Sequence, residues 1–194
     1  MTPSDVLELL EASGALLTGH FKLSSGLHSD RFIQKFRIFE DPPRAEAVAA
    51  ALARRLAPAN PNVVVSAAVG GIIPGFLVAK ALGVRSVFVE KETGKPTLRR
   101  GFRLGPADRA AVVEDVMTTG ASTREAIGVV EAHGAAIVAV GAVVRRGKAD
   151  VGRPVESLLD LPLEDSQPEN CRLCQAGFPL DDPGSRRANA ELDA

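Results

Sequence analysis

The sequence lacks features that several protein classes require. Only 2 of its 194 residues are cysteine, too few for a disulfide-dense secreted scaffold. No apolar run approaches the roughly 20 residues of a membrane-spanning helix, and residues 1–5 lack the basic-then-apolar order of a signal peptide. Charge is balanced, with 23 Lys and Arg against 24 Asp and Glu, whereas a general nucleic-acid binder is usually more basic. We therefore expect a cytoplasmic enzyme that binds neither a membrane nor nucleic acid.

From residue 41 onward, short apolar runs alternate with helical patterns. Runs of Val, Ile and Ala predict strands at residues 63–65, 86–89, 110–113, 136–144 and 155–161. Apolar residues at helical spacing predict helices that begin at Asp41 and that cover residues 72–82 and 123–133. Because the apolar runs are continuous rather than alternating, the strands should be buried on both faces. The pattern predicts an α/β fold, with a Rossmann-like parallel sheet flanked by helices.

The two ends of the chain do not follow this pattern. Thr2 and Asp5 have the spacing of a capping box, which predicts a helix over residues 2–13, and short mixed runs up to residue 39 predict a small β-rich region. The end of the chain is polar and rich in Pro and Asp, so we expect it to have little core potential. The chain thus divides into residues 1–40, a core at 41–162 and a polar tail at 163–194.

Residues 112–123 combine acidic, hydroxyl and glycine residues between a strand and a helix. The strand is expected to end in Glu114 and Asp115, and Thr118 to Ser122 follow at the start of the helix. A helix start binds phosphate through its free N–H groups, whereas adjacent acids suit sugar hydroxyls or a metal ion carried with the phosphate. We therefore predict a ribose 5-phosphate site. A capping box formed by Ser122 and Glu125 is the structural alternative, and the absence of Gly-Lys-Ser/Thr disfavours nucleoside triphosphate hydrolysis.

This segment resembles the phosphoribosyl pyrophosphate (PRPP) signature of type I phosphoribosyltransferases, in the form typical of the orotate-specific family. The resemblance implies the type I phosphoribosyltransferase fold with a small N-terminal hood within residues 1–40. It also implies a homodimer, and Mg²⁺ that arrives with PRPP and has no certain protein ligand. By the resemblance, the PRPP-binding residues are Gly70, Gly71, Lys91, Glu114, Asp115, Val116, Met117, Thr118, Thr119, Gly120, Ala121 and Ser122.

Gly70 and Gly71 lie between a predicted strand and a predicted helix. Paired glycines let the backbone approach a ligand closely, and their amides can form an anion nest. A plain turn with close packing is the alternative. In the resembled family this position is the pyrophosphate loop, and Gly71 stands where many bacterial relatives have a lysine.

Residues 90–102 bring four cations together in a polar stretch: Lys91, Lys95, Arg99 and Arg100. A solvated hairpin is one interpretation. The other is a lid whose cations stabilise the leaving pyrophosphate and exclude water. The resemblance favours a lid that reaches the neighbouring subunit. Lys91 matches the family pattern, whereas the other three cations are proposed on charge alone. We expect Lys91, Lys95 and Asp115 to be the catalytic residues.

Residues 19–33 resemble the family's hood, which implies that orotate lies against Phe32 and Ile33 and touches Thr118. Arg146 ends an apolar strand, where its planar fork could grip the orotate carboxylate. Phe32 as hood core and a surface pair of Arg145 and Arg146 are the structural alternatives.

The resemblance implies transfer of the phosphoribosyl group from PRPP to orotate, giving orotidine 5′-monophosphate in de novo pyrimidine synthesis. A uracil or purine phosphoribosyltransferase and a PRPP-binding regulator are the alternatives. Cys171 and Cys174 form a lone CxxC, half of a structural zinc site, with no nearby ligands in the sequence. Two tails of a dimer could complete four ligands, but we expect no catalytic role. His20, His28 and His133 are scattered, and nothing marks them as functional.

Overall fold

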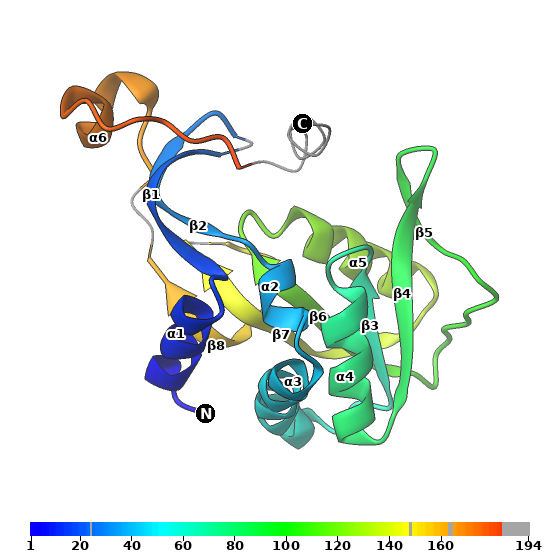
Figure 1. Ribbon diagram of the computed structural model, residues 1–194. Coiled ribbons are helices and arrows are strands. Elements are labelled where there is room, and N and C mark those ends of the chain that lie inside the picture. The colour runs from blue at the N-terminus through cyan, green and yellow to red at the C-terminus, as the bar shows by residue number, and fades with distance from the viewer. Residues whose placement is uncertain (24, 148, 163–164, 184–194) are drawn as a thin grey trace, which may run out of the picture.

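The computed structural model describes residues 1–23, 25–147, 149–162 and 165–183 (Figure 1). Ser24 of the predicted hood pattern, Leu163, Glu164 and residues 184–194 of the predicted tail lie outside these ranges. Along the chain the elements are α1 (Pro3–Ala12), β1 (Leu16–Lys22), β2 (His28–Ile33), α2 (Phe36–Phe39), α3 (Pro42–Leu56), β3 (Val63–Ala67), α4 (Ile72–Leu82), β4 (Arg85–Glu92), β5 (Lys95–Leu98), β6 (Arg109–Met117), α5 (Ala121–Ala132), β7 (Ala136–Arg146), β8 (Glu156–Leu161) and α6 (Arg172–Gln175).

A six-stranded sheet in the order β5-β4-β3-β6-β7-β8 forms the centre of the molecule. All neighbouring strands are parallel except β4 and β5, which form an antiparallel hairpin at one edge. Val64 belongs to a core cluster with residues of α1, α3 and α4, whereas Val63 and Val65 belong to a second cluster with residues of α5 on the opposite face. The sheet is therefore covered on both faces, as the continuous apolar runs predict, and the α/β expectation is confirmed.

Helices α3 and α4 begin where the sequence indicates, whereas α5 begins at Ala121, two residues before its predicted start. Asp41 caps α3 by accepting a hydrogen bond from the Arg44 N–H at 2.9 Å. Helix α4 follows Gly71 and ends at Gly83, which adopts a left-handed φ of 71°. Within the described residues no helix is both long and apolar enough to cross a membrane.

Several strands extend further than their apolar runs predict. Strand β6 does not end at Glu114 and Asp115 but continues to Met117, so the two acids lie within the strand. Strand β4 likewise continues through Glu90 to Glu92. Both extensions lie at the carboxyl ends of the strands, where ligands bind in parallel sheets. Polar residues at these strand ends interrupt the apolar sequence pattern, but the backbone remains in the strand conformation.

The N-terminal segment forms the hood as a separate two-stranded sheet of β1 and β2 beside the main sheet (Figure 1). Residues 165–183 of the tail are mostly exposed, in line with their low core potential, but they pair with the hood. His28 and Ser166 exchange two backbone hydrogen bonds of 2.9 Å, and the Asp181 N–H donates to the His20 carbonyl at 2.8 Å. Cys171 is only 2% exposed. This part of the tail therefore belongs to the hood structurally, as the position of α6 beside β1 shows (Figure 1).

Candidate functional site

Two adjacent carboxyl groups lie buried near the carboxyl end of β6. Glu114 is 7% exposed and Asp115 is 1% exposed. The Asp115 Oδ1 atom accepts a hydrogen bond from the Val116 N–H at 2.6 Å, and its Oδ2 lies 2.9 Å from Lys35 Nζ. The latter contact is an ion pair without hydrogen-bond geometry, because Oδ2 accepts no hydrogen bond in the described residues. Burial of an acid is unfavourable unless such partners are present.

The surroundings of Glu114 shift its protonation. Burial, followed by the charge of the adjacent Asp115, raises the pKa of Glu114 to about 8. Its Oε2 accepts a hydrogen bond from the Thr123 hydroxyl at 3.3 Å. Glu114 is therefore mainly protonated at neutral pH, whereas Asp115 faces a lysine. The protonated Glu114 carboxyl group can therefore donate a hydrogen bond to a polyhydroxyl ligand.

Lys35 is a site residue that the sequence analysis missed. It lies just after β2, at the junction of the hood and the core, and reaches the acid pair from outside the main sheet. Its ion pair spans 80 positions of sequence, and no local motif marks it.

The two glycines before α4 are crowded in different ways. A Cβ atom at Gly70 would overlap Asp115 Oδ2 and lie 2.5 Å from Lys35 Nζ. A Cβ at Gly71 would lie 2.7 Å from the Ala67 carbonyl oxygen. Close packing therefore accounts for Gly71, whereas Gly70 lets the loop lie directly against the Lys35–Asp115 pair. The loop and the acids thus form one site, although β3 and β6 supply them separately.

The segment between β6 and α5 is an open loop with free donors. Thr118, Thr119, Ala121 and Ser122 are exposed, and Gly120 caps α5 with a left-handed φ of 74°. Within the described chain the backbone N–H groups of Thr119 and Gly120 make no hydrogen bond. The capping box of Ser122 and Glu125 does not form, since Gly120 is the capping residue and no side chain caps it. Hydroxyls and amides at this helix start are therefore available to an anion.

Val116 and Met117 complete the predicted donor segment. They lie in β6, with Val116 half-buried and Met117 1% exposed. The Met117 side chain packs in the core shared with α5. These two residues therefore position the loop through the backbone and the core.

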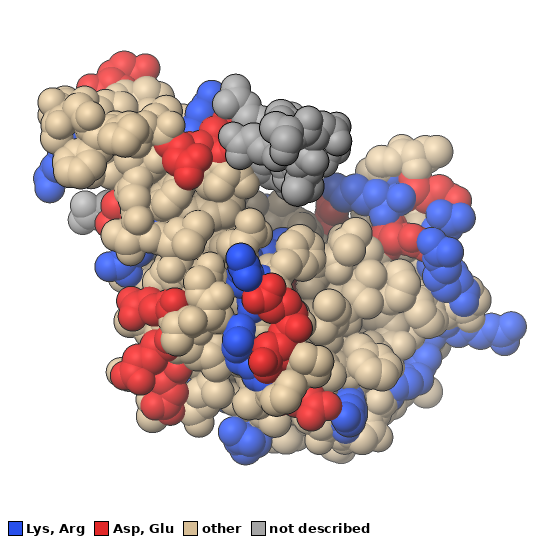
Figure 2. Space-filling view, in the orientation of Figure 1, with Lys and Arg blue, Asp and Glu red and all other residues tan. Residues whose placement is uncertain are grey.

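The predicted lid is the β4–β5 hairpin and the segment after it, and most of its cationic side chains form ion pairs with acidic residues. Arg100 forms a bidentate contact with Glu90 at 2.8 and 3.0 Å, and Arg99 lies 3.3 Å from Glu92. Lys91 binds Glu125 of α5 at 2.9 Å. Figure 2 shows this interleaving of positive and negative side chains on the hairpin side of the molecule.

Lys95 differs from the other three lid cations. It is exposed and takes part in none of the ion pairs that the structure describes. Its charge is therefore available to an incoming anion without breaking an existing pair, although the hairpin as described holds Lys95 at a sheet edge.

The predicted acceptor residues come from the hood and from β7. Phe32 is half-buried and lies against Phe21, with ring centroids 5.8 Å apart, and Ile33 packs on the main core. Phe32 therefore has a structural role in the hood and keeps part of its ring accessible. Ile33 is the last residue of β2, close in sequence to Lys35 at the acid pair.

Arg146 is held at the carboxyl end of β7 by the hood and the tail. Its Nη2 donates to Ser29 Oγ at 3.2 Å and to Asp165 Oδ1 at 2.5 Å. The side chain is 11% exposed, and its buried Nε has no hydrogen-bond partner among the described residues. A buried donor without a partner is costly. The adjacent Arg145 binds Asp160 instead, so a surface pair does not describe Arg146.

Comparison with known proteins identifies the family. No protein-family model matches the chain. The orotate phosphoribosyltransferase of Thermotoga petrophila is 48% identical over 183 residues, which cover 93% of this chain and 98% of that protein. The orotate phosphoribosyltransferase of Desulforamulus reducens is 42% identical over 189 residues, which cover 96% of this chain and 99% of that protein.

Solved structures share the fold at lower sequence identity. The orotate phosphoribosyltransferase of Aeropyrum pernix has a TM-score of 0.63 and 24% identity, over 91% of both chains. An adenine phosphoribosyltransferase of Thermoanaerobacter pseudethanolicus has a TM-score of 0.59 and 18% identity, over 66% of this chain and 87% of that one. Because the fold is common to enzymes for different bases, it confirms the type I architecture without selecting the base. With relatives up to 48% identical along nearly its whole length, the chain belongs to the orotate phosphoribosyltransferase family.

Proposed function

We propose that this protein transfers the 5-phosphoribosyl group from PRPP to N1 of orotate, with release of pyrophosphate, in the de novo synthesis of pyrimidine nucleotides. The observation that carries the proposal is the buried Glu114–Asp115 pair directly before the exposed loop from Thr118 to Ser122. The pair suits the ribose hydroxyls, and the loop suits the 5′-phosphate. The names of the relatives support orotate as the base.

On the donor side, the chain positions PRPP and stabilises charge. Free N–H groups of Thr119 and Gly120 and the start of α5 would hold the 5′-phosphate. The loop at Gly70 lies against Asp115, so a pyrophosphate bound there would lie beside the ribose. Bond breaking at the anomeric carbon leaves negative charge on pyrophosphate, which the cations of the hairpin would stabilise. Lys95, and Lys91 after release from Glu125, are the residues that we assign to this step.

On the acceptor side, Arg146 would select orotate by its carboxylate. Its unpartnered Nε can donate to a carboxylate oxygen, and Asp165 and Ser29 hold the rest of the guanidinium in place. Uracil and the purines lack that carboxylate and would leave the donor without a partner. Phe32 and Ile33 would line the base, with Thr118 at the boundary between the two substrates.

The residues fit Mg²⁺ that arrives on PRPP rather than a metal held by the protein. Lys35 neutralises Asp115, and the raised pKa of Glu114 keeps its proton on at neutral pH, so neither acid is a free ligand. When bound, the ion would offset part of the charge of the pyrophosphate.

A cytoplasmic location stays a prediction. We also propose a homodimer in which the β4–β5 hairpin reaches the partner's site. Lys95→Ala and Asp115→Asn chains, each of low activity alone, should rise to as much as about a quarter of wild-type activity when mixed, because exchange gives some dimers one intact site. Mixtures that stay inactive, although light scattering shows dimers that exchange subunits, would contradict a shared lid.

The reaction is tested by offering PRPP and Mg²⁺ with orotate, uracil, hypoxanthine or adenine. We expect consumption of orotate alone, followed by its absorbance, with one pyrophosphate released per orotate. Use of another base would contradict the assignment of the acceptor. PRPP binding by calorimetry without turnover of any base would support a regulator instead. Asp115→Asn should weaken PRPP binding in the same calorimeter.

A further inference from the structure

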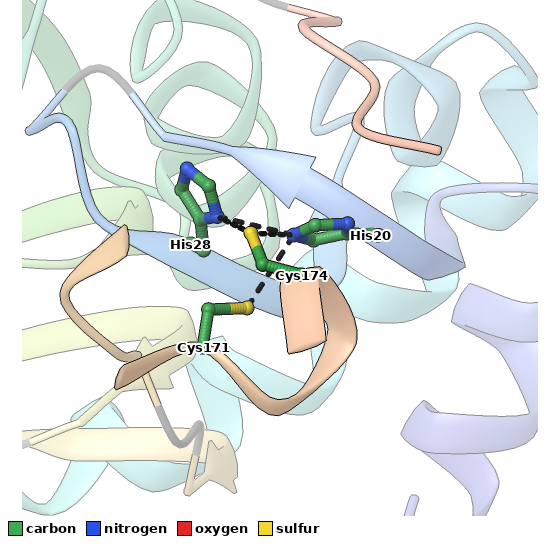
Figure 3. A group of neighbouring side chains, drawn as sticks. All are labelled: His20, His28, Cys171 and Cys174. Carbon is green, nitrogen blue, oxygen red and sulfur yellow. Dashed lines mark hydrogen bonds between the residues drawn. The ribbon is translucent and has the colours of Figure 1, made fainter. Parts of the chain in front are cut away.

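Four side chains that the proposed reaction does not use converge between the hood and the tail. They are His20 of β1, His28 of β2, Cys171 just before α6, and Cys174 within α6. One potential ligand atom from each lies within 4.8 Å of all the others. The expectation that the CxxC pair lacks further ligands is wrong, because the hood supplies two histidines. Figure 3 shows the imidazole nitrogens and the sulfur atoms directed toward one another.

Four of the six distances between these atoms are close to the edges of a tetrahedron around a single ion, and the other two are within 4.8 Å. His20 Nε2 lies 3.1 Å from His28 Nδ1, 3.4 Å from Cys171 Sγ and 3.6 Å from Cys174 Sγ. Cys174 Sγ lies 3.2 Å from His28 Nδ1. With Zn–N bonds of about 2.0 Å and Zn–S bonds of about 2.3 Å, tetrahedral geometry gives N···N edges of about 3.3 Å and N···S edges of about 3.5 Å.

A hydrogen bond from outside the cluster determines which ring nitrogen of His20 carries the proton. Its Nδ1 lies 3.0 Å from the carbonyl oxygen of Phe178. A carbonyl only accepts, so Nδ1 carries the proton and Nε2 presents its lone pair to the cluster. Such a hydrogen bond to the second nitrogen is the usual support of a metal-binding histidine.

Hydrogen bonds alone do not satisfy this arrangement. The single lone pair of His20 Nε2 has three close neighbours: His28 Nδ1, Cys171 Sγ and Cys174 Sγ. If Cys171 donates to it and Cys174 donates to His28 Nδ1, the lone pairs of the two imidazoles face each other at 3.1 Å. If His28 Nδ1 donates to it instead, neither thiol can use that lone pair. One cation at the centre, by contrast, interacts with all four atoms at once.

We propose that His20 Nε2, His28 Nδ1 and the sulfur atoms of Cys171 and Cys174 bind one zinc ion per chain. Two thiolates and two imidazoles suit zinc better than magnesium or calcium, which prefer oxygen. Four protein ligands leave no open position, so the site is structural rather than catalytic. Three of the four residues are buried, and Cys174 lies at the surface. The ion fastens α6 and residues 165–183 to the two hood strands.

The first test measures metal content in the full-length chain, freed of any affinity tag and never exposed to a chelator. Mass spectrometry of the metal should give about one zinc per chain, and Cys174→Ser and His28→Ala should lose most of it. His133→Asn is the matched control, because His133 binds the Val129 carbonyl on α5, away from the cluster. Zinc-free protein that also fails to take up added Zn²⁺ would overturn the proposal, as would full zinc content in both variants.

The second test needs no variant and therefore holds even if the substitutions prevent folding. X-ray absorption at the zinc edge of the wild-type protein should show two nitrogen and two sulfur neighbours. Replacement by Co²⁺ should give the intense bands of tetrahedral cobalt and a thiolate charge-transfer band. An all-oxygen or octahedral environment, or a Cys171–Cys174 disulfide in the freshly purified protein, would overturn the assignment. None of these measurements depends on orotate turnover.

Discussion

Removal of the Arg146 guanidinium should separate the acceptor from the donor side of the reaction. Arg146→Ala deletes a side chain that is 11% exposed and that contacts Ser29 and Asp165 rather than the PRPP loop. A hydrogen bond to a charged group contributes about 1.5–3 kcal/mol, which corresponds to a change of about 10- to 150-fold in binding. We expect the kcat/KM for orotate to fall within that range.

The structure places the expected loss in the upper part of the range. Arg146→Ala leaves the Asp165 carboxylate without its partner, and Asp165 is only 29% exposed. Its unpaired negative charge would then repel the orotate carboxylate. Arg146→Ala combined with Asp165→Asn should therefore recover part of the orotate kcat/KM that the single variant loses.

The assay is the initial rate of orotate consumption, with each substrate varied at saturation of the other. The KM for PRPP should change by less than about threefold, because the polar partners of Arg146 among the described residues are Ser29 and Asp165, outside the donor loop. Arg145→Ala is the matched control, because this neighbouring arginine binds Asp160 on β8 instead. Equal losses for both substrates, or an equal effect of Arg145→Ala, would refute the role assigned to Arg146.

Three further predictions concern the donor side. The folded-state pKa of Glu114, about 8, lies above its ordinary value of 4.5. The stability that this residue contributes is therefore full below pH 4.5 and is lost as the pH rises through 8. In urea unfolding, the stability of Glu114→Gln should depend less on pH over that interval than the stability of the wild type, and equal slopes would contradict the raised pKa. Gly70→Ala should weaken PRPP binding in calorimetry and destabilise the fold by about 1–3 kcal/mol, because the added Cβ overlaps Asp115. Unchanged PRPP affinity would count against a ligand that lies close to the backbone of this loop. Lys95→Ala should lower kcat by about 10- to 100-fold with an unchanged melting temperature, and a wild-type kcat would remove Lys95 from the lid mechanism.

The sequence predicts the core more closely than the ends of its strands. The helix over residues 72–82 is found at those bounds, because small residues at Gly71 and Gly83 mark both ends. Strand β6 is underestimated, because its apolar run stops before Glu114 while the strand continues to Met117. Acids are poor strand formers by propensity, but the neighbouring strands supply the hydrogen bonds that keep the backbone extended.

Two physical reasons explain why the sequence does not reveal Lys35 and the two hood histidines. Lys35 reaches Asp115 only after the hood folds over the sheet, and no pattern within either segment contains that contact. The histidines are obscured in another way, since the register of β1 and β2 shifts between Thr18 and Phe21. As a result His20 and Phe21 are both buried, although strict alternation would expose one of them.

The acceptor side depends on a part of the chain to which the sequence assigned no function. Asp165, which holds Arg146, is next to Ser166, which pairs through the backbone with His28. His28 is in turn one of the four groups at the proposed zinc site. A continuous series of contacts therefore leads from the metal ligands to the guanidinium that would select orotate. Because the hood and the tail each contribute one half of this series, neither segment alone can fix the position of Arg146.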